Sequence, residues 1–148
     1  MTRRGLLATP LAVWERDGLK AALVKAGLPA DDVGDARLLF WRFETTDIPV
    51  GFGGLEIHGS DALLRSLVTL PPLRQIGMGA AMVAVLETEA RALKCRAIYL
   101  LTASDANFFG RLGYAPCARN EVPEAIRASR QFAEFCAPTV AAMVKHIG

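Results

Sequence analysis

Two closely spaced glycines, Gly77 and Gly79, lie in the run RQIGMG, between an apolar stretch and a long alanine-rich stretch of the chain. Glycine lets the backbone come close to a ligand, and the start of a helix presents unpaired N–H groups and a positive dipole end to an anion. The run has neither the Lys-Ser/Thr pair of a P-loop nor the third glycine of a dinucleotide-binding loop. It predicts either a pyrophosphate-binding turn or an ordinary turn between a strand and a helix.

Several charged residues near this run in the sequence could act on a substrate. Glu44 and Glu56 fall within predicted strands, and either carboxylate could take a proton from a substrate ammonium, although solvated strand residues fit the same pattern. His58 follows at the end of a predicted strand, where a turn residue is the simpler interpretation. Arg65 lies in the apolar string LLRSLV, where a guanidinium needs a partner to offset its burial. A buried ion pair and a fork that holds a substrate carboxylate both fit this pattern.

The elements that position these residues follow from hydrophobic periodicity and turn residues. Thr9 and Pro10 predict the start of the first helix, with threonine as N-cap and proline in the first turn. The predicted strands are residues 5–8, 36–44, 50–58, 61–70, 97–101, 114–119 and 139–146, and the predicted helices are residues 9–26, 75–94, 104–112 and 123–135. This order, β α β β β α β α β α β, predicts an α+β chain with one βαβ crossover in a mainly antiparallel sheet.

The composition is that of a single globular domain over residues 1–148, with 52% hydrophobic and 22% charged residues. A net charge of +2 without a run of Lys or Arg argues against nucleic-acid binding. The three cysteines stand far apart and only two histidines accompany them, so they predict no metal site, and an odd count suits the cytoplasm. No apolar stretch approaches the roughly 20 residues of a membrane span. We expect a cytoplasmic protein that binds neither nucleic acid nor membrane.

Several strings in the chain resemble the GCN5-related N-acetyltransferase (GNAT) family. LLRSLVTLPPLRQIGMGAAM is similar to that family's fourth strand, cofactor turn and following helix, AIYLLT to its fifth strand, and NFFGRLGY to the aromatic segment beside the cofactor tail. PEAIRASRQFAEFCAPTVAAM and AGLPADDV resemble the small arsenic-resistance N-acetyltransferases, and LLRSL resembles the acetyltransferase domain of N-acetylglutamate synthases. The resemblance covers nearly the whole chain and implies a mixed, mainly antiparallel sheet with helices on both faces and one central βαβ crossover.

For the cofactor, the resemblance implies acetyl-CoA. Backbone N–H groups of the glycine turn would hold its pyrophosphate, and Arg74 would add charge nearby. The main chain of the fourth strand would bond the pantetheine where the fourth and fifth strands splay apart, and a backbone N–H near Leu67 would polarise the thioester carbonyl. The implied cofactor-binding residues are Leu67, Val68, Arg74, Gln75, Ile76, Gly77, Met78, Gly79, Ala80 and Phe109.

The chain departs from the family's pattern at Phe109, where many members have a tyrosine that is thought to protonate the departing thiolate. Phenylalanine has no hydroxyl, so either the thiolate leaves unprotonated or Ser104, Tyr114 or a water supplies the proton. Glu56 is the candidate base. Tyr114 also fits a core aromatic residue with its hydroxyl at the edge of the core.

The resemblance further implies direct acetyl transfer to the primary amine of a small, amino-acid-like acceptor. Arg65, Arg127 and Arg130 are the candidate acceptor-binding residues, although Arg127 and Arg130 also fit surface charges on one helical face. Relatives are often dimers, so a homodimer is possible. A non-catalytic acyl-CoA-binding or sensing module is the alternative, and an interaction domain without a ligand is a second one.

Overall fold

The protein is described by a computed structural model that covers residues 6–46, 48–70, 77–134 and 139–148. The strands are β1 (Leu6–Pro10), β2 (Leu39–Thr45), β3 (Ile48–His58), β4 (Asp61–Thr69), β5 (Ala97–Thr102), β6 (Ala115–Cys117) and β7 (Ala141–His146). The helices are α1 (Asp17–Lys25), α2 (Met78–Ala92), α3 (Ala106–Arg111), α4 (Glu124–Arg127) and α5 (Arg130–Glu134), with single turns η1 (Val13–Glu15) and η3 (Arg119–Glu121).

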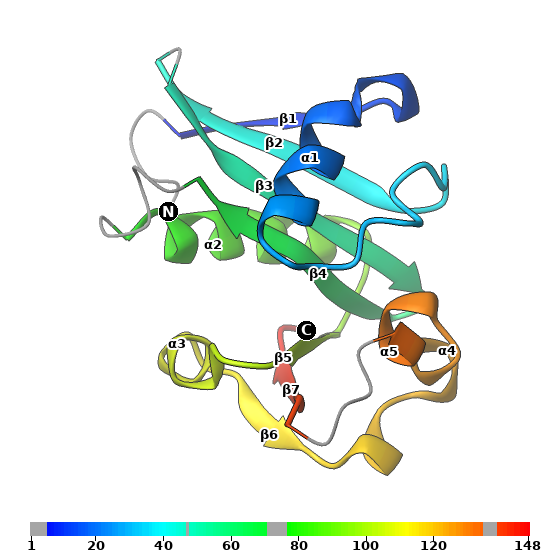
Figure 1. The fold of residues 1–148 in the computed structure, drawn as a ribbon. Helices are drawn as coiled ribbons and strands as arrows, with labels where there is room; N and C mark the ends of the chain where they lie inside the picture. Colours follow the sequence, from blue (N-terminus) through cyan, green and yellow to red (C-terminus); the bar gives the residue numbers. More distant parts are fainter. Residues whose placement is uncertain (1–5, 47, 71–76, 135–138) are drawn as a thin grey trace.

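The described strands form one seven-stranded sheet in the order β1-β2-β3-β4-β5-β7-β6. All neighbouring strands are antiparallel except β4 and β5, which are parallel and joined through α2. Alternate residues of β2 point to opposite faces, so that Phe40 packs with Leu19 and Leu23 of α1 while Trp41 and Phe43 pack in the cluster that contains α2. Helices α1 and α2 therefore cover opposite faces (Figure 1). The α+β fold with a central βαβ crossover is confirmed.

The prediction of a helix from Thr9 is wrong. Thr9 and Pro10 belong to β1, where they pair with Arg42 and Trp41 of β2, and α1 begins only at Asp17. β1 lies at the edge of the sheet, and a proline is tolerated there because one side of an edge strand needs no ladder hydrogen bond.

The predicted helix over residues 123–135 is also wrong, because the chain forms two short helices, α4 and α5, instead. The backbone N–H of Phe132 donates to the Ser129 hydroxyl at 3.2 Å. A serine side chain that accepts a hydrogen bond from the backbone N–H three residues later is an N-cap. Ser129 therefore begins a new helix, α5, and the chain turns between α4 and α5.

The sheet opens between β4 and β5. These strands pair only through residues 61–63 and 97–99, whereas β4 continues along β3 to Thr69 and β5 continues along β7 to Thr102. The half with β1–β4 and the half with β5–β7 diverge beyond this point (Figure 1).

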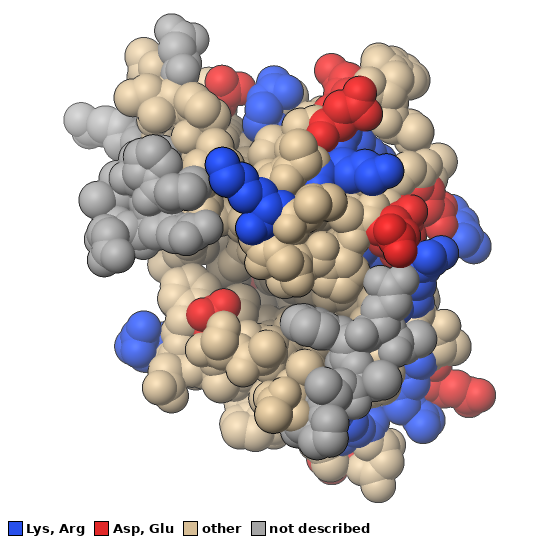
Figure 2. Space-filling view, in the orientation of Figure 1, with Lys and Arg blue, Asp and Glu red and all other residues tan. Residues whose placement is uncertain are grey.

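Acidic and basic side chains are interspersed on the face that Figure 2 shows, rather than gathered by sign. Over the described ranges no helix combines the length and the apolar character that a bilayer crossing requires. Within the same ranges no three His, Cys, Asp or Glu residues are grouped in a way that could hold a metal ion.

The segment between α1 and β2 is tied to the sheet by the buried guanidinium of Arg16. Its Nη1 donates to the carbonyls of Val33 and Asp35 at 2.9 Å each, and its Nη2 donates to the Leu38 carbonyl at 2.9 Å. The same group lies over the Phe40 ring, with Cζ 5.0 Å from the ring centroid. One side chain therefore satisfies carbonyl groups of a segment that forms no ladder.

Replacing Arg16 should destabilise the fold without any direct effect on a ligand. Arg16→Met leaves several buried carbonyls without a donor, so we expect a loss of about 3 kcal/mol in unfolding free energy, measured by urea denaturation. Arg37→Met is the matched control, because Arg37 is exposed and its ion pair among the described residues is with nearby Asp35. The urea midpoint of this variant should stay close to that of the wild type. Equal midpoints for the two variants would contradict this role of Arg16.

Candidate active site

A cavity of about 720 Å³ occupies the opening between β4 and β5. One wall is the edge of β4 over residues 64–69, and the opposite wall is the end of β5 with the loop that follows it. The first turn of α2 and the α3 residues Phe108 and Phe109 line it, and Gln131 of α5 closes part of it. The volume lies within the range of small-molecule sites, roughly 300–1,000 Å³.

A β-bulge interrupts β4 at the cavity wall. The register with β3 shifts between Phe52 and Gly54, so that Ser66 and Leu67 together oppose Gly53. Ser66 has a φ of 59°, which is uncommon outside glycine and re-aims the backbone that follows. Since no described strand pairs with β4 on its β5 side beyond Leu63, backbone groups near the bulge face the cavity instead of a ladder.

The glycine turn lies at the start of α2, as predicted. Gly77 is the N-cap in the left-handed conformation, with a φ of 76°, and the first turn carries no acidic residue. Gly77, Gly79 and Ala80 line the cavity, and Met78 packs against the hydrophobic core instead. The first N–H groups of a helix have no intrahelical partner, so this end can bind an anion. Arg74, Gln75 and Ile76 lie outside the described residues.

Gly79 has a packing role that the sequence interpretation did not include. A Cβ at this position would lie 3.1 Å from Cζ of Phe108, so the glycine lets this ring reach the start of α2. Phe108 contacts Phe109 edge to face, with ring centroids 4.9 Å apart. Both rings line the cavity, and Phe109 is buried with no hydroxyl to offer.

Arg65 lies in a buried network of charges. Its Nη1 and Nη2 donate to the two carboxylate oxygens of Asp32 at 2.7 and 2.6 Å, and Nη1 also donates to Glu56 at 3.3 Å. Its Nε donates to the Ser66 hydroxyl at 3.2 Å. These four hydrogen bonds leave one of the five guanidinium N–H groups. Asp32 occupies the forked end of the guanidinium, so this end is not available to a substrate carboxylate. Arg65 stays a candidate acceptor-binding residue through its one remaining N–H.

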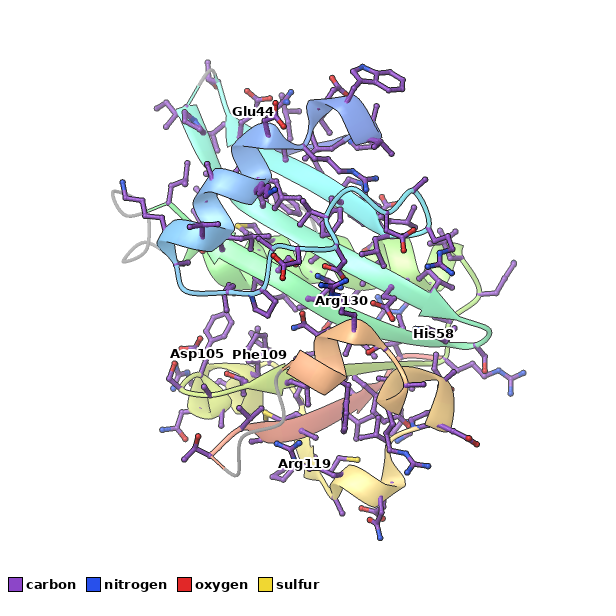
Figure 3. All side chains as sticks on the ribbon, turned by 45° about the vertical axis from the view of Figure 1, so that its right-hand side comes forward. Glu44, His58, Asp105, Phe109, Arg119 and Arg130 are labelled. Carbon is purple, nitrogen blue, oxygen red and sulfur yellow. The ribbon has the colours of Figure 1, made fainter. Side chains whose placement is uncertain are left out.

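Glu56 reaches Arg65 with one oxygen and His58 with the other. His58 Nε2 lies 2.6 Å from Oε2 of Glu56, and Glu56 does not line the cavity. Glu56 therefore stays a candidate base that would need a water to reach the acceptor. Glu44 is paired with Arg42 at 3.4 Å and lies far from Asp105 and Phe109 (Figure 3).

The two candidate proton donors lie in different places. Ser104 is exposed in the loop after β5 and lines the cavity. Tyr114 is buried away from the cavity lining, and its hydroxyl donates to Glu87 Oε2 at 3.0 Å. Burial, and then the charge of Glu87, raise the pKa of Tyr114 above its usual range. Lys145 donates to the same Glu87 carboxylate at 3.0 Å. Ser104 is the better placed of the two.

The two arginines predicted on one helical face lie on different helices. Arg127 is on α4 and donates to the Val122 carbonyl at 3.0 Å. Arg130 is on α5, visible in Figure 3, and lies 3.5 Å from Asp31, with both side chains largely exposed. Neither lines the cavity, and their part in acceptor binding stays a prediction.

The sequence interpretation gave no role to Asp32, Asp105 or Gln131. Asp32 holds the fork of Arg65, while Asp105 and Gln131 line the cavity. Asp32 lies in the string AGLPADDV, and an acidic residue there was an available signal for a partner of the buried arginine. No feature of the sequence identified Gln131 as a cavity residue, because its position depends on the start of a separate helix at Ser129.

The acetyltransferase (GNAT) family model matches residues 8–114 of the 148-residue chain. The chain therefore belongs to the GNAT acetyltransferase family. Membership confirms the predicted family, the acyltransferase class and acetyl-CoA as the cofactor of that class. No curated protein sequence matches the chain significantly.

Solved structures share the fold at low identity. N-acetylglutamate synthase from Neisseria gonorrhoeae, complexed with coenzyme A and N-acetyl-glutamate, superposes with a TM-score of 0.81 at 14% identity, over 99% of this chain and 36% of that one. Rv2747 from Mycobacterium tuberculosis, in complex with CoA and NLQ, superposes with a TM-score of 0.73 at 19% identity, over 95% of this chain and 98% of that one. Aminoglycoside 6'-acetyltransferase type Ii superposes with a TM-score of 0.69 at 19% identity, over 96% of this chain and 97% of that one. The chain thus spans about a third of the synthase's length.

Acetyl-CoA binding should depend on the backbone at Gly77. At 100 times its dissociation constant, acetyl-CoA should stabilise the wild type by about 2.7 kcal/mol. Gly77→Val should abolish this shift, because a branched side chain blocks the approach of the diphosphate. Gly59→Val is the control: Gly59 has a φ of 63° with open space around it and does not line the cavity. Thermal unfolding of each variant with and without acetyl-CoA measures the shift, and a full shift in Gly77→Val would place the cofactor elsewhere.

Tyr114→Phe should affect stability and leave the chemistry unchanged. Loss of the hydrogen bond to Glu87 should cost about 1.5–3 kcal/mol near neutral pH. Because folding raises the pKa of Tyr114, its contribution is complete below the unfolded value, about 10, and is lost at higher pH. The deficit of the variant should therefore shrink in alkaline urea titrations.

The matched activity measurement is the pH profile of kcat. Tyr114→Phe should keep the shape of the wild-type profile, whereas Ser104→Ala should alter its high-pH limb, since Ser104 lines the cavity. If Tyr114→Phe alone removed that limb, the tyrosine would be the proton donor.

Proposed function

We propose that the protein transfers an acetyl group from acetyl-CoA directly to the primary amine of a small, amino-acid-like acceptor. The observation that carries this proposal is the cavity between β4 and β5. An unpaired strand edge, a β-bulge and the start of a helix meet there, and each supplies backbone donors. These are the groups that an acyl thioester with an attached diphosphate requires.

The donor would lie along the edge of β4. Its diphosphate would bind the N–H groups after Gly77, and its pantetheine amides would pair with the main chain of Leu67 and Val68 as an added strand. The N–H near the bulge would donate to the thioester oxygen as negative charge develops on it. A donor of this kind contributes roughly 3 kcal/mol to the transition state.

The acceptor amine must lose a proton before it attacks the carbonyl carbon. Glu56 would take this proton through water, and Ser104 or water would return one to the departing thiolate. A thiol with a pKa near 8.5 is also an adequate leaving group without protonation. Phe109 then acts through packing of the cavity wall alone.

Transfer without an acetyl-enzyme is supported by the described cysteines. Cys95 and Cys117 do not line the cavity, and burial raises the pKa of both thiols. A thiol held in its protonated form away from the thioester is a poor nucleophile. The acetyl group would therefore pass to the amine in one step.

The amino-acid-like acceptor rests on resemblance to the arsenic-resistance N-acetyltransferases and on structural similarity to N-acetylglutamate synthase. The same fold also serves an aminoglycoside acetyltransferase, so the scaffold does not determine the acceptor. A cytoplasmic location and a homodimer remain part of this proposal.

Thiol release from acetyl-CoA across a panel of amines tests the proposal. The panel contains free amino acids, amino-acid amides and an aminoglycoside, and Gly77→Val is the control without the cofactor turn. We expect steady thiol release with at least one amino-acid-like amine and no acetylated protein by mass spectrometry. Because Phe109 has no hydroxyl, a non-catalytic acyl-CoA-binding module is the alternative. It predicts acetyl-CoA binding without thiol release for every amine, and an interaction domain predicts no acetyl-CoA binding.

A further inference from the structure

The Gln131 side chain at the cavity has a buried oxygen without a hydrogen-bond partner among the described residues. Among the described residues, Gln131 Oε1 is the one buried side-chain oxygen or nitrogen without a hydrogen bond. Gln131 is 5% exposed and lines the cavity between β4 and β5. An unpaired buried carbonyl is unfavourable in the empty protein, and ligand sites tolerate this because the ligand supplies the missing partner.

The position of Gln131 relates it to the acceptor rather than to the cofactor. It lies on α5, and its neighbour Arg130 reaches Asp31 of the segment that follows α1. On the cavity wall it accompanies Arg65 and Ser66 of β4 and Ala26 and Leu28 after α1. Helix α5 lies near β4 (Figures 1 and 3).

The charges at this end of the cavity favour a hydrogen-bond donor over a carboxylate. The guanidinium of Arg65 contacts two carboxylates, those of Asp32 and Glu56, so it presents no excess positive charge. Its remaining N–H can make only one bond with an oxygen of the acceptor. The side-chain carbonyl oxygen of Gln131 can only accept a hydrogen bond, so it needs a donor on the acceptor molecule.

We propose that Gln131 determines acceptor specificity by accepting a hydrogen bond from an N–H or O–H group of the acceptor. The inference rests on the proposed acetyltransfer. The acceptor is then an amine that carries a second donor group, separate from the amine that is acetylated, and the N–H or O–H of this second group faces Oε1. An amine without such a group leaves this oxygen unpaired and is discriminated against.

Two substitutions at this position separate the roles of the oxygen. Gln131→Met keeps the length of the side chain and removes the acceptor, so the KM of the preferred amine should rise about tenfold or more. Gln131→Glu keeps an oxygen in place, and the KM should stay within about threefold of the wild type for a cationic amine. The acetyl-CoA-induced thermal shift should be the same in all three proteins.

A control and a stability measurement exclude a structural role. Glu124→Met on α4 changes an exposed side chain outside the cavity lining and should leave the KM unchanged. The unfolding midpoint of Gln131→Met without ligand should equal or exceed that of the wild type, because an unpaired buried atom is removed.

An unchanged KM in Gln131→Met would overturn the inference and leave the proposed function intact. A lower unfolding midpoint, with all amines weakened alike, would assign Gln131 to structure and also overturn it. A larger loss in Gln131→Glu than in Gln131→Met would show that the amide donates instead of accepting. If the wild type acetylates no amine in the panel, the proposed function and this inference fail together.

Discussion

The cavity depends on one strand, β4, whose ladder is much longer along one edge than along the other. β4 keeps its ladder with β3 to Thr69 but pairs with β5 only as far as Leu63. Buried backbone groups need partners, so an unpaired edge inside a protein is stable only if a ligand or water satisfies it. The bulge at Ser66 and Leu67 strengthens the local twist and turns those groups toward the opening. In the proposed function, acetyl-CoA would complete the sheet rather than occupy a finished pocket.

A second constraint acts on the acceptor side, where the chain between α1 and β2 forms no ladder. Two buried guanidinium groups hold it, Arg16 through its carbonyls and Arg65 through Asp32. Both lie near the Phe40 ring, with Cζ atoms 5.0 and 5.7 Å from its centroid. A buried ion pair that loses one partner is strongly destabilised, so a change at Arg65 would shift this segment together with any acceptor contact.

Features with local causes could be predicted from the sequence, and features with tertiary causes could not. The glycine turn, the meander and the crossover follow from periodicity and turn residues, and the structure contains them. Thr9 and Pro10 have the chemistry of a helix start, yet pairing with β2 overrides it. Ser129 has the chemistry of an N-cap inside a helical pattern, and its side chain does cap a second helix. The apolar surroundings of Arg65 in the sequence predicted that it needs a partner. The sequence did not identify this partner, because only the fold brings Asp32 to Arg65.

The same distinction separates the two ends of the cavity. The proposed cofactor end consists of main-chain groups after Gly77 and along β4. Any sequence that forms this turn and this bulge supplies these groups. The proposed acceptor end consists of side chains from three separate segments, represented by Leu28, Arg65 and Gln131. Their combination arises only in the folded chain, because α5 changes direction at Ser129 and Arg65 is already occupied by Asp32. In the proposed function, acetyl-CoA is therefore bound through groups that the family shares, whereas acceptor choice would rest on an unpaired side-chain atom at this end. Among the described residues that atom is Gln131 Oε1.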